Sequence, residues 1–136
     1  MRLASSLLLP SLLALPVAAH AEAAPMREGL WEISASVEMP GMPFKIPPTV
    51  VQQCVTKQDA AQAGVPPQGG DCTVSDVRRT GSKVSWKVTC TGQSAGKGEG
   101  EVTFSGPNAY SGWMKMETGG MKMSTAYKAK RVGDCK

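Results

Sequence analysis

Leucine is confined almost entirely to the start of the chain, and this distribution limits the folds open to the rest. Seven of the eight leucines lie between residues 3 and 15, and only Leu30 follows them. After residue 21 the aliphatic side chains are mostly valine, which favours β-strands over helices, as do threonine and the aromatic residues. The sequence therefore predicts a mainly β domain behind an N-terminal segment of different character.

The leucine-rich start has the organisation of a secretory signal peptide. A basic residue precedes an apolar run over residues 3–17, and Ala19-His20-Ala21 matches an Ala-x-Ala cleavage site. A membrane anchor is the alternative, but two prolines interrupt a run shorter than the roughly 20 apolar residues that cross a bilayer. We expect residues 1–21 to be cleaved near Ala21, leaving residues 22–136 as one β-rich domain, periplasmic or secreted and without a membrane span.

Period-two alternation of apolar and polar side chains identifies the first strand. Trp31, Ile33 and Val37 share one face, and glutamates and serines occupy the other. Four prolines make residues 39–48 an irregular loop. Further strands are predicted over residues 49–55, 72–79, 82–91, 97–105, 109–117 and 121–132. We expect an antiparallel meander of about seven strands that forms a curved sheet, a half-barrel or a barrel.

One short helix is predicted after the second strand. Thr56 is a good N-cap with Asp59 three residues later, and Gly64 suits the position just after the helix.

Four cysteines in an exported domain predict two disulfides, for which three pairings exist. No two cysteines have the C-x-x-C spacing that zinc sites and thioredoxin-like redox sites prefer. A three-residue turn at residues 80–82 places Cys72 opposite Cys90 and Asp76 opposite Trp86. We therefore favour Cys72–Cys90, leaving Cys54–Cys135 to tie the tail to the helix start, each bridge contributing about 3–4 kcal/mol.

Methionine supplies much of the apolar volume. Only 16 of residues 22–136 are Leu, Ile, Val or Phe, a low fraction for a globular domain, so seven Met and three Trp must compensate. A two-residue Gly119-Gly120 turn pairs Met116 with Met123 and Thr118 with Met121. Met114 joins the other three methionines on one face. Three interpretations stay open: core filling, the lining of a pocket for an apolar ligand, or a Cu(I) or Ag(I) site.

The pocket interpretation is our leading hypothesis, and it expects no cofactor. It places a small apolar ligand on the face to which successive strands bring their large and soft side chains. The expected lining residues are Trp31, Trp86, Phe104, Tyr110, Met114, Met116, Met121 and Met123. A further alternative is a structural or protein-interaction module that meets an envelope protein through the outward-facing Trp113.

Catalysis and nucleic-acid binding have little support in the sequence. His20 is the only histidine and leaves with the signal peptide, which removes Ser-His-Asp and Cys-His chemistry. Glu99 and Glu101 share a face, but that face is the solvent side of its strand. The basic residues are scattered and do not form the stripe that nucleic acid requires. We expect a non-enzymatic protein.

These features together resemble the small exported bacterial proteins grouped as domain of unknown function 3617. The likeness rests on Gly29-Leu30-Trp31-Glu32, the Met-Pro-Gly-Met-Pro loop at residues 39–43, Cys54 before a short helix, Trp86 with Cys90, Tyr110-Ser111-Gly112, and Val132-Gly133-Asp134-Cys135. The resemblance implies a periplasmic or secreted protein, and it implies no activity.

A weaker likeness is to the lipocalins. Gly29-x-Trp31 in the first strand and Arg131 in the last look like the Gly-x-Trp and late arginine of that family. The likeness implies a sheet curved enough to hold one small ligand. The helix after the second strand departs from the lipocalin pattern.

Overall fold

The computed structural model describes residues 26–66 and 69–136, so the predicted signal peptide lies outside the described residues. Seven antiparallel strands form one sheet. They are β1 (Gly29–Glu38), β2 (Thr49–Val55), β3 (Cys72–Thr80), β4 (Lys83–Cys90), β5 (Gly96–Phe104), β6 (Ala109–Thr118) and β7 (Met121–Gly133). The helix α1 (Lys57–Ala61) follows β2, and a 3-10 turn, η1 (Gly92–Ser94), joins β4 to β5.

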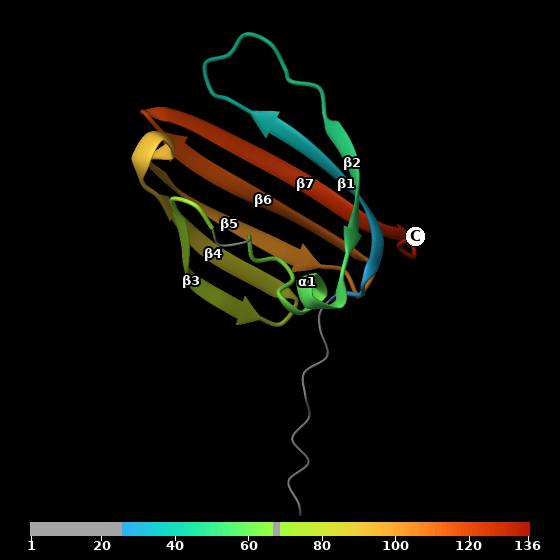
Figure 1. Ribbon diagram of the computed structural model, residues 1–136. Helices are drawn as coiled ribbons and strands as arrows, with labels where there is room; N and C mark the ends of the chain where they lie inside the picture. Colours follow the sequence, from blue (N-terminus) through green and yellow to red (C-terminus); the bar gives the residue numbers. More distant parts are fainter. Residues whose placement is uncertain (1–25, 67–68) are drawn as a thin grey trace, which may run out of the picture.

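The sheet is open and strongly curved (Figure 1). Its order is β2-β1-β7-β6-β5-β4-β3, so a meander from β3 to β7 continues sideways into β1, and β2 and β3 are the two edges. Helix α1, which connects these edges in sequence, lies at one end of the sheet (Figure 1). The prediction of a curved antiparallel sheet with one short helix is confirmed, and the sheet does not close into a barrel.

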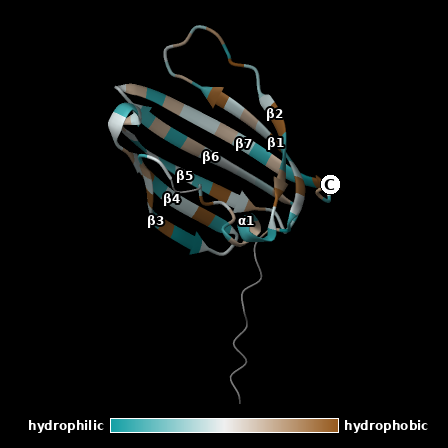
Figure 2. Ribbon diagram, viewed as in Figure 1, coloured by the Kyte–Doolittle hydropathy of each residue, from teal (hydrophilic) through white to brown (hydrophobic). Residues whose placement is uncertain are grey.

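Strand pairing gathers the apolar side chains on the concave face. Ile33 lies opposite Ala129, Val74 opposite Val88 and Val84 opposite Val102. The resulting alternation of apolar and polar residues runs along the strands (Figure 2). The buried core is Met26, Trp31, Val55, Ala60, Ala63, Val74, Val84, Trp86, Val88, Cys90, Val102, Phe104 and Ala129.

Glycines on the concave face of β5 and β6 lie beneath large side chains of neighbouring strands. A Cβ atom at Gly100 would lie 2.5 Å from Cζ2 of Trp86, and one at Gly112 would lie 2.8 Å from Cε2 of Tyr127. The side chain of Met116 crosses Gly98 in the same way. These glycines are required because the space of their side chains is already occupied by a ring or a thioether.

Helix α1 begins as the sequence predicts. The Thr56 hydroxyl accepts from the backbone N–H of Asp59, and the Asp59 carboxylate accepts from the backbone N–H of Thr56 at 3.0 Å. These hydrogen bonds form a capping box, which satisfies donors that a helix start leaves unpaired. The helix ends earlier than predicted, with Gln62 as C-cap. Gly64 has a positive φ of 82° but lies two residues beyond that cap, where a Cβ would meet Val102.

The β3–β4 hairpin reaches the predicted cysteine register by a different route. Thr80 pairs with Lys83, so the turn has two residues and not three. A bulge between Ser75 and Arg78 then shifts the register by one, so that Asp76 and its neighbour Val77 together face Trp86. Asp76 accommodates the bulge with a φ of 53°, and its carboxylate accepts from Arg78 Nε at 3.1 Å.

Both predicted disulfides are present, and they lie at opposite ends of the sheet. Cys72–Cys90 joins β3 to β4, with Cα atoms 4.0 Å apart. Cys54–Cys135 joins the end of β2 to the segment after β7, with Cα atoms 5.6 Å apart. Within residues 26–66 and 69–136, no helix has the length and apolar character that a membrane crossing needs.

The contact between Gly100 and Trp86 predicts the effect of adding one methyl group. Gly100→Ala should lower the free energy of unfolding by about 1–3 kcal/mol, because the new Cβ overlaps a rigid indole ring. Urea denaturation measures the change. Gly133→Ala is the matched control in β7, where a Cβ meets nothing within 4 Å. Equal stability of the two variants would contradict this account of the glycine.

Candidate ligand-binding site

The concave face contains a hollow beside helix α1, which we call the α1-end hollow. Its volume is about 350 Å³. The sheet contributes side chains from six strands, and residues 56–66, the covering segment, close over one side. The main lining residues are Met26, Ile33, Val55, Ala63, Val65, Trp86, Val102, Tyr110, Met114 and Tyr127, and Gln53, Asp59 and Gln62 are also in contact with it.

A row of aromatic rings supports this hollow. Tyr110 contacts Trp31 at 5.6 Å and Phe104 at 5.7 Å between ring centroids, and Tyr127 packs edge-on against Tyr110 at 6.4 Å. Trp31 is completely buried and Phe104 nearly so. These two predicted site residues are therefore core residues that hold Tyr110 in place.

Both tyrosines have perturbed acidity. Burial raises the pKa of Tyr127 to about 12, and the charge on an ionised Tyr110 adds to this effect. Burial also raises the pKa of Tyr110. Both phenols therefore stay protonated at physiological pH and can donate hydrogen bonds.

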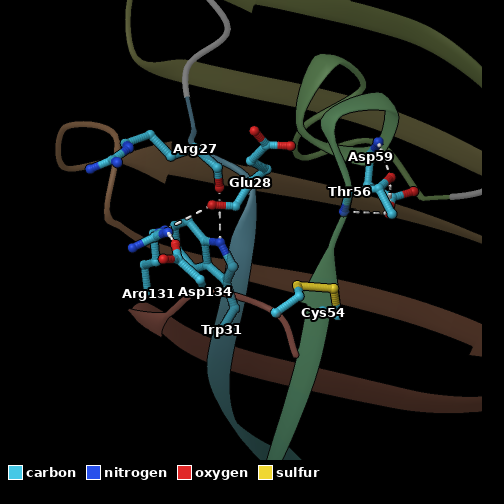
Figure 3. Close-up of a disulfide and its surroundings, with 9 residues drawn as sticks. Arg27, Glu28, Trp31, Cys54, Thr56, Asp59, Arg131 and Asp134 are labelled. Carbon is cyan, nitrogen blue, oxygen red and sulfur yellow. Dashed lines mark hydrogen bonds and ion pairs between the residues drawn. A yellow bond between two sulfur atoms is a disulfide. The ribbon is translucent and has the colours of Figure 1, made fainter.

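The strand ends next to the hollow are fixed by Arg131 (Figure 3). Its Nε donates to the carbonyl oxygen of Glu28 at 2.8 Å, and its guanidinium also pairs with Asp134. The indole N–H of Trp31 donates to the carbonyl oxygen of Arg27 at 3.0 Å. Gly29, whose φ is 137°, leaves room for the guanidinium. These bonds hold the start of β1 against the end of β7, which positions Trp31 beneath Tyr110.

A second and larger hollow, the methionine-end hollow, lies toward the β6–β7 turn. Its volume is about 620 Å³, and its lining includes Val88, Gly98, Met116 and Met123. The predicted pairing of Met116 with Met123, and of Thr118 with Met121, is confirmed. The structure therefore divides the eight predicted site residues: Trp31 and Phe104 lie in the core, Trp86, Tyr110 and Met114 line the α1-end hollow, and Met116 and Met123 line this one. Met121, 73% exposed, lines neither.

Comparison with known proteins places the chain in a family. Residues 26–135 match the family described as protein of unknown function, DUF3617. The chain belongs to this family. No curated protein and no solved structure matches it. The resemblance to DUF3617 is confirmed, while the lipocalin likeness stays a prediction.

The convex face of this DUF3617 protein carries charged side chains and Trp113. Glu101 pairs with Lys83 at 3.1 Å, and Lys130 pairs with Glu32 at 3.2 Å. Trp113 lies opposite Glu101, half-buried, with the Lys115 ammonium 5.0 Å from its ring centroid. Within the described part of the chain, no three His, Cys, Asp or Glu side chains are grouped as a metal site.

Sequence reasoning missed several lining residues of the α1-end hollow. Tyr127 was recoverable, because extending the predicted Met116–Met123 register places it opposite Gly112 on the methionine face. Val65 could not be predicted as a lining residue. It lies in a loop, and the loop sequence has no periodic pattern that would show where the loop crosses the sheet. Its position depends on Gly64, which packs against Val102.

The sequence contains only two tyrosines, and both line the α1-end hollow. Their titration therefore tests the burial of the hollow directly. Phenolate absorbance of the folded protein should appear above pH 10, whereas the urea-unfolded chain should titrate near pH 10. The free energy of unfolding should fall as pH rises from 10 toward 12, because the unfolded chain releases the phenol protons first. Tyr127→Phe should remove the later absorbance transition. A transition of full amplitude at pH 10 in the folded protein would contradict the burial.

Proposed function

We propose that this protein is an exported, non-enzymatic binding protein that holds a small, mainly apolar molecule in the α1-end hollow. The observation that carries the proposal is a hollow of about 350 Å³ on the concave face, lined by aliphatic, aromatic and thioether side chains from six strands. This volume falls within the range of small-molecule sites.

The construction of the hollow supports binding over simple core packing. A solid core would bring the side chains of the covering segment into full contact with those of the sheet. Here Ala60 and Ala63 of the covering segment are buried, whereas Val65 and the sheet residues Met114 and Tyr127 stay partly exposed around the hollow. The covering segment is held at one end by the Cys54–Cys135 bridge beside Thr56.

The chemistry of the side chains supports binding without catalysis. After residue 20 the chain has no histidine, and its four cysteines are bridged. Asp59, the carboxylate beside the hollow, is engaged by Thr56, which lowers the pKa of the carboxyl through a hydrogen bond from its side chain and one from its backbone. A group that stays ionised in a capping box is poorly placed for proton transfer.

Probe binding tests the proposed site. The fluorescence of N-phenyl-1-naphthylamine should rise when it binds, and Val65→Trp should weaken binding by at least about tenfold by filling the hollow. The matched control is Ala61→Trp, which adds the same indole to an exposed position of α1. Circular dichroism checks the fold of both variants. Equal affinity of the two variants would place the probe elsewhere and reject the site.

Native mass spectrometry of protein purified from the periplasm without reductant tests export and occupancy together. The expected mass begins at Glu22, lacks four hydrogens because of two disulfides, and carries a bound apolar molecule. Retention of residues 1–21 would contradict cleavage.

The same measurement addresses a second candidate, Cu(I) or Ag(I) binding by Met114, Met116, Met121 and Met123. The direct pairing of Met116 with Met123 on the concave face favours it, because thioethers are soft ligands. A copper adduct that disappears when all four methionines are replaced by leucine would support it. Its absence after Cu(I) titration would reject it.

A further inference from the structure

One polar atom of the concave face stands apart from its apolar surroundings. Trp86 is 3% exposed, and its Nε1 has no hydrogen-bond acceptor among residues 26–66 and 69–136. Trp31 differs, because its Nε1 donates to the carbonyl oxygen of Arg27. An unpaired donor in an apolar site costs free energy unless an acceptor is supplied, so such atoms are uncommon in folded proteins.

Trp86 borders the α1-end hollow and is held there by the sheet. Its indole lies across Gly100, where a Cβ would be 2.8 Å from Cε2, the ring carbon that carries Nε1. Gly100 lies directly opposite Met114, which lines the same hollow. The ring therefore cannot move toward the backbone of β5 to find an acceptor there.

Other groups around the hollow favour the same ligand chemistry. Tyr110 and Tyr127 contribute phenol O–H groups, which are donors as well. Among the described lining residues there is no lysine or arginine, and the charge present is that of Asp59. A carboxylate ligand would lack a counter-ion there, whereas a neutral oxygen needs none.

We propose that the ligand is a neutral, mainly apolar molecule with a carbonyl oxygen, which accepts a hydrogen bond from Trp86 Nε1 at the wall of the α1-end hollow. Neighbouring atoms cover Nε1 in this structure, so the ligand must displace them to reach it. This inference rests on the proposed function and adds the class of ligand to it. A saturated hydrocarbon would fill the same space and leave the indole unpaired. Cations and carboxylates would bind less well than neutral carbonyl compounds.

Two probes that differ by a carbonyl group in place of a methylene group test the inference. Acetophenone and ethylbenzene have the same carbon skeleton, and only acetophenone has a carbonyl. In the wild-type protein, acetophenone should move the indole N–H proton signal of Trp86 downfield in ¹H–¹⁵N spectra, and ethylbenzene should not. This signal is assigned in the wild-type protein from the contact of the indole with Gly100.

Affinities of variants give an independent measurement. Trp86→Phe should weaken acetophenone binding by about tenfold and change ethylbenzene binding by less than about twofold. Trp113→Phe, on the convex face, is the matched control and should change neither. If Trp86→Phe does not fold, the wild-type indole signal decides alone.

The outcomes separate this inference from the proposed function. If both probes bind the hollow but move the Trp86 indole signal alike, the hydrogen bond is rejected and the binding site stands. If neither probe binds, the proposed function fails and the ligand class fails with it.

Discussion

The concave face depends on large side chains that pack directly over glycines of neighbouring strands. Trp86 lies across Gly100 and Met116 across Gly98, and Tyr127 lies close to Gly112. A domain with so few Leu, Ile, Val and Phe residues cannot fill its interior with small aliphatic groups. It instead uses a few large side chains, each lying over a bare stretch of backbone. Such packing leaves hollows between the rings, and the α1-end hollow is one of them.

The two disulfides supply stability that a small core lacks. Cys72–Cys90 spans a sequence separation of 18 and Cys54–Cys135 one of 81. In the loop-closure model these separations correspond to about 3 and about 4–5 kcal/mol. Cys54–Cys135 also anchors the covering segment. This one bridge therefore contributes both to the stability of the domain and to the geometry of the hollow.

Much of the fold could be predicted because strand alternation and turn residues are local signals. The strict alternation after Gly29 marked β1, and the Gly119-Gly120 turn fixed the methionine register, since both glycines adopt the positive φ that such turns need. The cysteine pairing followed from the register of one hairpin, although a bulge at Asp76 and a shorter turn produced that register.

The site was less accessible to sequence reasoning, because its shape depends on how the sheet curves and where the covering segment lies. Trp31 and Trp86 have the same strand alternation and the same indole, yet one donates to a backbone carbonyl and the other does not. This difference arises from Arg27, which precedes β1, and from Arg131 near the end of β7, neither of which a periodic pattern encodes. Met114 and Met116 are two residues apart on the same face of β6, yet they line different hollows.

The position of Cys135 has a consequence for the order of assembly. Because this cysteine follows β7, and its partner lies near the end of β2, the bridge cannot form until every strand has been synthesised. Cys72–Cys90 has no such restriction and can close as soon as the β3–β4 hairpin emerges. Oxidative folding then has an early local bond and a late one that fixes the covering segment, so a chain interrupted before β7 ends never completes its concave face.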